Sequence, residues 1–248
     1  MAVDNSSFLR RDLWLTEMLG YDVFRLEIDD SIFTKMKRVE SEERRAIRSM
    51  RERNAMVYCK IKPIHLEIAD FLFDFGFRLV DTNLTMKVKL TDGLGEGNFD
   101  GIRLAVMEDE DDVAQLAKRS FSFSRFHLDP AIRCEYADNL KSEWARNFFR
   151  GKRGDAMVVA TENSGVVAFL QLVYADSEMV IDLIAVDAAH RGEGIAKKII
   201  RYAIAQGKAF ESMKVGTQIA NLVSIRLYES LGFTIHTFEH VLHFHNHQ

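Results

Sequence analysis

Two glycines, Gly192 and Gly194, lie between an apolar run and a helix-forming run of this 248-residue sequence. Glycine removes the side chain where the first backbone N–H groups of a helix have no intrahelical partner. Those N–H groups, together with the positive end of the helix dipole, can bind a pyrophosphate. Many tight turns share this composition, so the loop alone leaves a phosphate site and an ordinary turn equally open. The candidate ligand-binding residues are Arg191, Gly192, Glu193, Gly194, Ile195 and Ala196.

A second candidate pair, Asn221 and Tyr228, lies further along the chain. The seven positions between them correspond to two helical turns, so both residues face one side of the helix expected at 221–231. Both side chains could therefore contact one bound molecule. The alternative is that Asn221 caps the helix and that Tyr228 is a core aromatic residue.

The elements that must position these residues follow from the apolar pattern of the second part of the chain. Alternating and continuous apolar runs predict strands, and apolar residues at helical spacing predict helices. Strands are expected at 102–107, 156–161, 166–174, 179–186, 213–218 and 233–244, and helices at 112–119, 131–149, 194–210 and 221–231.

The first part of the chain predicts a smaller α/β unit. Strands are expected at 22–28, 56–61 and 77–90, and helices at 31–53 and 64–75. The glycine-rich segment 93–98 is expected to be a linker between an N-terminal domain, 1–92, and a C-terminal domain, 99–248.

The junctions around Gly76 and Gly232 have similar sequences. Each glycine is expected to end a helix in a left-handed conformation, just before a phenylalanine that starts a strand. Chance similarity is an equal alternative. If the similarity is real, the first domain is a degenerate copy of the second, and Leu72 stands where the second has Tyr228.

Taken together, the loop and the later helix resemble the GNAT acetyltransferases. Arg191–Ala196 matches the Gln/Arg-x-x-Gly-x-Gly/Ala coenzyme A loop of that family and follows a Leu-Ile-Ala-Val strand. Residues 221–233 are similar to the family's Asn…Leu-Tyr-Glu-x-Leu-Gly-Phe element, whereas Ala188 stands where many relatives have proline. The resemblance implies an α+β GNAT fold, in which helices flank a mixed, mostly antiparallel sheet. It also implies an acetyl-CoA-dependent N-acetyltransferase.

The same resemblance implies roles for residues of the site. Backbone N–H groups of Ile184, Ala185 and Val186 would polarise the thioester carbonyl, and Asn221 would contact the pantetheine arm. Tyr228 would protonate the leaving thiolate. The base is left open between Asp182, which stands where several relatives have an acidic residue, His127, and a chain of waters. Asp182 is also compatible with an ordinary polar position on a strand.

The acceptor amine is indicated by two segments, Phe121–Pro130 and the helix with Trp144 and Asn147. Ser120–His127 resembles a segment of the bacterial TDP-fucosamine acetyltransferases, which also have a Gly-Phe-x-Leu-Val junction like Gly76–Val80. This resemblance implies a TDP-amino sugar as substrate, with Arg125 and His127 as substrate-binding residues, although the relatives have arginine at position 127. Arg125 could pair with a diphosphate, and packing of the phenylalanines on the core is the alternative.

Other functions stay open beside this one. The acceptor could be an aminoglycoside, an amino acid or a protein N-terminus, and the chain could be a non-catalytic acyl-CoA-binding module. His240, His243, His245 and His247 are interpreted as a solvated strand end, because the sequence shows no upstream ligand pair, so no metal is expected.

Composition narrows the possible partners and the possible location of the protein. The 33 basic and 37 acidic residues give a formal net charge of -4 without a basic cluster, so no nucleic acid partner is expected. Only Cys59 and Cys134 are present, which favours a reducing cytoplasm. No apolar run approaches the length that spans a bilayer, so neither a membrane segment nor an export signal is expected. A homodimer is left open.

Overall fold

The computed structural model describes residues 8–162 and 165–246. The chain forms two compact units. The first comprises the described residues of Met1–Asn83, Leu128–Ala131 and Phe238–Gln248, and the second those of Leu84–His127 and Ile132–Thr237. Strands β4 (Arg78–Lys89) and β10 (Thr234–Asn246) contribute residues to both units.

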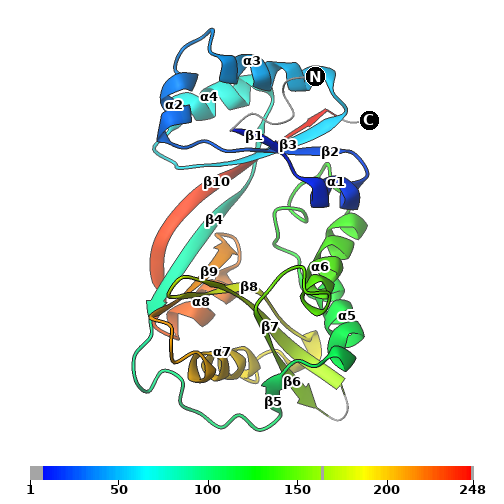
Figure 1. The fold of residues 1–248 in the computed structure, drawn as a ribbon, viewed down its shortest axis with the longest axis vertical. Helices are drawn as coiled ribbons and strands as arrows, with labels where there is room; N and C mark the ends of the chain where they lie inside the picture. The colour runs from blue at the N-terminus through cyan, green and yellow to red at the C-terminus, as the bar shows by residue number, and fades with distance from the viewer. Residues whose placement is uncertain (1–7, 163–164, 247–248) are drawn as a thin grey trace. The chain divides into compact units, whose positions relative to one another are not determined.

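The first unit is a small sheet with helices on both faces. Its strands are β1 (Leu9–Arg11), β2 (Asp22–Leu26), β3 (Ala55–Ile61) and the end of β10, in that order, and only β2 and β3 are parallel. Its helices are α1 (Leu13–Leu19), α2 (Asp30–Met36), α3 (Glu42–Ser49), the short η1 (Met50–Glu52) and α4 (Leu66–Phe75). Apolar side chains of α2, α3 and α4 share one core with the strands, on the face opposite α1 (Figure 1).

The second unit is a larger mixed sheet between two helical layers. Its strand order is β10-β4-β9-β8-β7-β6-β5, with β5 (Ile102–Leu104), β6 (Ala156–Glu162), β7 (Gly165–Ala175), β8 (Glu178–Val186) and β9 (Ser212–Gln218). Strands β5 to β8 pair antiparallel, and β8 and β9 pair parallel. The sheet therefore confirms the expected mixed, mostly antiparallel fold.

The helices of the second unit lie on two faces of its sheet (Figure 1). Helices α5 (Glu110–Ser120) and α6 (Cys134–Phe149) pack on one apolar cluster, and α7 (Ile195–Gln206) and α8 (Leu222–Glu229) pack on the other. Short helices η2 (Met107–Asp109) and η3 (Ala188–His190) precede α5 and α7. No helix among the described residues is long and apolar enough to cross a membrane.

The single helix predicted at 31–53 is wrong, because the structure has two helices and a 3-10 turn there. Ser41 starts the second helix: its side chain accepts a hydrogen bond of 3.2 Å from the backbone N–H of Arg44. Glu42 and Glu43 add negative charge to the first turn, where the helix dipole favours it. A capping serine followed by acidic residues is the local pattern that separates the two helices.

The predicted linker 93–98 is packed against a helix rather than free. A Cβ atom added at Gly95 would lie 2.8 Å from the backbone nitrogen of Ala205 in α7, so the backbone approaches the helix closely. Just beyond, the ring of Phe99 contacts that of Tyr202, with centroids 5.4 Å apart. The two compact units divide between Asn83 and Leu84, inside β4. A boundary within a continuous strand leaves no cluster of glycines in the sequence.

The two glycine junctions share their local geometry. Gly76 and Gly232 have φ angles of 114° and 83°, as expected for left-handed caps. The N–H of Phe77 donates to the carbonyl of Leu72 at 2.9 Å, and the N–H of Phe233 donates to that of Tyr228 at 3.0 Å. Leu72 and Tyr228 therefore occupy corresponding buried positions. That the first unit is a degenerate copy of the second remains a prediction.

Candidate functional site

Strands β8 and β9 separate partway along their length. Their parallel pairing runs from Glu178 opposite Ser212 to Ile181 opposite Val215. Strand β8 continues to Val186 and stays paired with β7, whereas no pairing with β9 is found for this part of it among the described residues. The backbone edge of residues 182–186 that faces β9 is therefore open. The expected backbone ligands Ile184, Ala185 and Val186 belong to this stretch, in which alternate residues turn their N–H groups to the open edge.

A β-bulge at Asp182 marks the point of separation. Leu172 of β7 lies opposite Ile181 and Gln171 lies opposite Leu183, so Asp182 is the extra residue. Bulges change which face a side chain points to. Consistent with this, Ile181 packs in the cluster beneath α7 and α8, whereas Leu183 packs in the cluster beneath α5 and α6.

The loop Arg191–Ala196 leads from this region into α7. Gly192 and Gly194 have φ angles of 88° and 79°, and a Cβ atom added to either would meet nothing within 4 Å. The backbone conformation, and not crowding, therefore requires glycine at both positions. Gly194 caps α7 without a side-chain hydrogen bond, and Arg191 Nε donates to the carbonyl of Val186 at 3.2 Å. The first N–H groups of α7 point out of an exposed loop, as anion binding requires.

Tyr228 is buried in the apolar cluster that Ile184, Val186 and Ile195 border. It is 2% exposed, and burial raises the pKa of its hydroxyl well above the usual value. The phenol therefore stays protonated. Asn221 is the N-cap of α8: its Oδ1 accepts a hydrogen bond of 3.2 Å from the N–H of Ser224. The capping alternative thus holds for Asn221, which engages its side-chain oxygen.

Asp182 is surrounded by four hydrogen-bond donors. Arg153 binds its carboxylate in a bidentate pair at 2.7 and 2.6 Å. The indole N–H of Trp144 donates to Oδ2 at 2.8 Å, and the side-chain amide of Gln171 donates to the same oxygen at 3.0 Å. Asp182 therefore accepts three hydrogen bonds at Oδ2 and one at Oδ1 on the α5 and α6 face of the sheet, and is not an ordinary polar position on a strand.

His127 lies in a separate hydrogen-bonded group. Its Nδ1 is 2.6 Å from Ser124 Oγ, and its Nε2 is 3.0 Å from Asp138 Oδ1. Both ring nitrogens are thus engaged, and among the described residues none of these contacts joins it to Asp182. Arg125 stacks on the neighbouring Phe126 ring, with its guanidinium carbon 4.5 Å from the ring centroid.

Lys141 of α6 is a charged residue near Asp182 that the sequence interpretation missed. Its side chain is 8% exposed, and burial lowers its pKa to about 8, while Asp182 raises that pKa and Arg125 and Arg153 lower it. The sequence signal that could have identified Lys141 is its place on the apolar stripe of α6, one turn from Ala137 and one turn from Trp144. A lysine within an apolar helix face is a candidate for a special environment.

The C-terminal histidines are not all a solvated strand end, so that interpretation is wrong for His243, which is 1% exposed. Asp129 Oδ2 lies 2.5 Å from His243 Nδ1 and 2.6 Å from His245 Nε2. Burial raises the pKa of Asp129, but the two hydrogen bonds outweigh burial and hold it well below its usual range. His240 contacts Thr82 at 3.0 Å, and His247 lies outside the described residues.

Asp129, His243 and His245 together are a donor set that divalent transition metals accept. The same contacts are those of a hydrogen-bonded ion pair. Distant chain segments bring the acidic residue to the histidines, which is why local sequence spacing did not indicate it.

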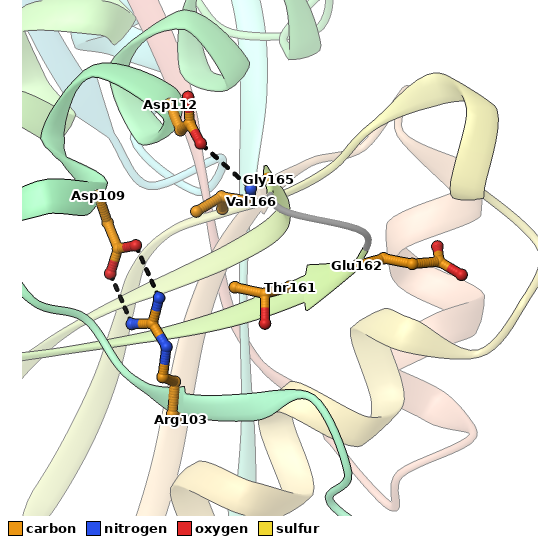
Figure 2. Close-up of a pocket in the computed structure, with 7 residues that line it drawn as sticks. All are labelled: Arg103, Asp109, Asp112, Thr161, Glu162, Gly165 and Val166. Carbon is orange, nitrogen blue, oxygen red and sulfur yellow. Dashed lines mark hydrogen bonds and ion pairs between the residues drawn. The ribbon is translucent and has the colours of Figure 1, made fainter.

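A cavity of about 270 Å³ lies beside the β6–β7 hairpin. Figure 2 shows its Arg103 bound through two nitrogens to Asp109, at 2.7 and 2.8 Å, and Asp112 facing the backbone of Val166. None of the predicted site residues is among its described lining. The lining consists of Arg103, Asp109, Asp112, Thr161, Glu162, Gly165 and Val166.

Two curated proteins match about half of this chain in sequence. SpsD of Bacillus subtilis (strain 168), a spore coat polysaccharide biosynthesis protein, is 35% identical over 128 residues, which cover 51% of this chain and 44% of that protein. N-acetylaspartate synthetase of Xenopus tropicalis is 28% identical over 113 residues, 43% of this chain and 39% of that protein. The chain therefore spans less than half the length of either curated relative.

Solved structures share the fold over nearly the whole chain. A functionally unknown protein from Staphylococcus epidermidis ATCC 12228 has a TM-score of 0.66 at 14% identity, covering 98% of this chain and 93% of that chain. A tandem GNAT protein from the clavulanic acid biosynthesis pathway has a TM-score of 0.60 at 15% identity, covering 91% and 76%. Residues 111–233 match the profile of the acetyltransferase (GNAT) family. These residues, about half of the chain, are therefore a domain of the acetyltransferase (GNAT) family.

Proposed function

We propose that this protein transfers an acetyl group from acetyl-CoA to a primary amine. The observation that carries the proposal is the separation of β8 and β9 beside the glycine loop of α7, in a domain of the GNAT family. An open strand edge and a helix N-terminus together supply N–H donors for a carbonyl and for a pyrophosphate.

In this proposal the chain binds the cofactor at two places. N–H groups of the loop 191–196 bind the pyrophosphate, and N–H groups on the open edge of Ile184–Val186 stabilise negative charge on the carbonyl oxygen. Acetyl-CoA supplies the activated thioester. The amide of Asn221 remains a predicted contact of the pantetheine arm, with its oxygen already capping α8.

Tyr228 is proposed to assist departure of the thiolate by hydrogen bonding. Burial raises its pKa far above the value of about 8.5 for a thiol, so complete proton transfer to sulfur is unfavourable. A neutral phenol in a low-dielectric site still donates a strong hydrogen bond to a developing negative charge.

Asp182 is proposed to hold neighbouring side chains in position, and it stays a candidate base for the acceptor amine. Its oxygens hold Arg153, Trp144 and Gln171 at hydrogen-bond distance. For a base role, Asp182 offers Oδ1, which accepts one hydrogen bond, from Arg153, whereas His127 would have to release its contact with Ser124 or Asp138. A water chain that deprotonates the ammonium needs no such change.

The acceptor is proposed to be the amino group of a nucleotide-linked amino sugar, such as a TDP-amino sugar. Support comes from the segment with Arg125 and His127 and from SpsD, whose name connects it with polysaccharide biosynthesis. The relative named N-acetylaspartate synthetase favours an amino acid as the second candidate.

A panel of amines tests the proposal and ranks the acceptors. Release of the CoA thiol is measured with acetyl-CoA and TDP-4-amino sugars, aspartate, polyamines, aminoglycosides and peptides. Release that is highest with a 4-amino sugar nucleotide is expected. Release only with another amine would overturn the acceptor and keep the activity, and binding of CoA without turnover on any amine would support the non-catalytic alternative.

The role of Tyr228 is tested by Tyr228→Phe. Removing the hydroxyl is expected to lower kcat by about tenfold or more, with little change in the KM for acetyl-CoA. Tyr202→Phe is the control, because Tyr202 lies in the same unit and its ring contacts Phe99. An unchanged kcat in Tyr228→Phe would remove the hydroxyl from the mechanism.

A further inference from the structure

The side chain of Lys141 is mostly buried, and its ammonium, which keeps a small solvent contact, has no protein hydrogen-bond partner among the described residues. The residue is 8% exposed, and within residues 8–162 and 165–246 its Nζ makes no hydrogen bond or ion pair. An ammonium can donate three hydrogen bonds, and burying a charge without them is costly. A position of this kind is explained when a ligand supplies the missing partner.

The surroundings of Lys141 are aromatic on two sides. Its Nζ lies 4.9 Å from the ring centroid of Phe121 and 4.7 Å from that of Trp144. The guanidinium of Arg153 also lies over the Trp144 ring, at 4.6 Å. Cation–π attraction compensates part of the desolvation and leaves the three N–H donors unused. Arg153 is exposed, so this group of side chains reaches solvent.

The neighbouring carboxylate does not supply the partner. Asp182 already accepts hydrogen bonds from Arg153, Trp144 and Gln171. The charged groups that act on Lys141 are Asp182 of β8, Arg125 before α6 and Arg153 after it. Burial and the arginines lower the pKa of Lys141 to about 8, so most of the side chain is still protonated at pH 7.

A second unsatisfied polar atom lies in the same group. Gln171 is completely buried, and its Oε1 has no hydrogen-bond partner among the described residues. Its amide nitrogen is bound to Asp182, so the carbonyl is fixed beside that carboxylate. The ammonium of Lys141 and the side-chain carbonyl of Gln171 therefore both have unused hydrogen-bonding capacity next to the bulge where β8 and β9 separate.

We propose that Lys141 binds an anionic group of the acceptor, either a phosphate or a carboxylate. Lys141 is then a specificity-determining residue, and the enzyme selects amines that carry a negative charge near the reacting nitrogen. A charge-assisted hydrogen bond from a buried ammonium selects against neutral analogues, which would leave the ammonium unpaired. The inference rests on the proposed function, because it places the acceptor on the α5 and α6 face of the sheet.

The experiment compares Lys141→Met with Lys152→Met. Methionine keeps the aliphatic length between the two rings and removes the charge, and exposed Lys152 on the loop after α6 receives the same substitution as the control. Thermal unfolding and the KM for acetyl-CoA verify that each variant is folded, and Lys141→Gln replaces Lys141→Met should the latter be unstable. Acceptors are used in pairs: a TDP-linked 4-amino sugar with its methyl glycoside, and aspartate with its diamide.

Lys141→Met is expected to lower kcat/KM for an anionic acceptor by about tenfold to a hundredfold, mainly through KM. It should leave the neutral partner of the pair within about twofold, and Lys152→Met should change neither. A loss confined to the charged member of the sugar pair indicates that Lys141 binds a phosphate. The same result for the aspartate pair indicates that it binds a carboxylate. An equal loss on charged and neutral acceptors, or no loss on either, would overturn the inference.

A binding measurement separates this inference from the proposed function. Calorimetry at low salt, with CoA saturating its own site, measures binding of inorganic pyrophosphate and of succinate. Binding of either to the wild type and to Lys152→Met, but not to Lys141→Met, supports the anion site even without acetyl transfer. Equal binding to all three proteins, or binding to none, rejects the site whatever the activity.

Discussion

Asp129 joins two histidines of β10 through one carboxylate oxygen in the first unit. The carboxylate is 3% exposed, and His243 and His245 lie within 2.6 Å of Oδ2. A buried carboxylate that loses its charge leaves such donors without an ionised partner. The group therefore contributes to stability only while Asp129 is ionised.

The sign of the pH dependence follows from the lowered pKa of Asp129. An unfolded aspartate has a pKa of about 3.9, and the folded value lies well below it. The stabilisation is fully present above the unfolded pKa and is lost as pH falls through the folded pKa. Urea unfolding at pH 7 and at successively lower pH values is expected to show this loss below about pH 4.

Asp129→Asn is expected to lower the free energy of unfolding at pH 7 by about 3 kcal/mol, because it breaks a buried charge-assisted pair. The loss should shrink at acid pH. Asp70→Asn, at an exposed position of α4, is the matched control and should be close to neutral. A variant as stable as the wild type at pH 7 would show that the ionised carboxylate does not stabilise the fold.

For single residues, the sequence identified candidates by residue type and short spacing. It did not predict which side chains surround them in the folded protein. Gly192 and Gly194 were identified from the sequence by residue type, and the structure gives both of them positive φ angles. The burial of Lys141 depends on Phe121 and Trp144, and the partners of Asp182 come from helix α6, strand β7 and the segment after α6. No local pattern fixes such contacts, because they form only when the sheet and helices pack.

At the scale of elements, the loop into α7 is expected to matter for cofactor binding beyond its backbone strain. Gly194→Ala places a Cβ at a φ angle of 79°, which costs about 1 kcal/mol of stability. Reorienting the N–H groups is expected to raise the KM for acetyl-CoA by about tenfold, a loss of about 1.4 kcal/mol in binding.

Gly20→Ala is the matched control for Gly194→Ala. Gly20 ends α1 with a φ angle of 78°, and a Cβ there also meets nothing within 4 Å. Both variants should show a similar loss of stability in thermal unfolding, and only Gly194→Ala should weaken the binding of acetyl-CoA. Equal KM values in the two variants would mean that the loop does not bind the cofactor.

Most helices and strands of the second unit begin and end close to their predicted residues, because their apolar runs are long and regular. Two local features, one in each unit, were not predicted. Ser41 divides one charged stretch into two helices through a single side-chain hydrogen bond. The bulge at Asp182 depends on the register between β7 and β8, which the alternation of β8 alone does not specify.

At the scale of the whole molecule, one cofactor site per chain is expected. The sequence of the first unit contains only Gly20 and Gly76 as glycines, and both follow helices. It therefore has no glycine loop before a helix, and Leu72 has no hydroxyl. Calorimetric titration with CoA should give one bound molecule per chain. Two equivalent sites would contradict a cofactor-free first unit.

The fold of the molecule was predictable because two motifs in the right order identify the family domain. The division into units was not, since β4 and β10 each contribute to both units and residues 128–131 join the first. Gly95 shows the same difficulty locally: its segment has the composition of a linker but is packed on α7.

We expect acetyl transfer to an amine, and not thioester hydrolysis, at the opening between β8 and β9. The most direct test measures CoA thiol by absorbance and N-acetylated amine by mass spectrometry in the same reaction, with the preferred acceptor. We expect equal amounts of the two products, with both formed only when the amine is present. Thiol release that is independent of the amine, or no N-acetylated product, would contradict the account.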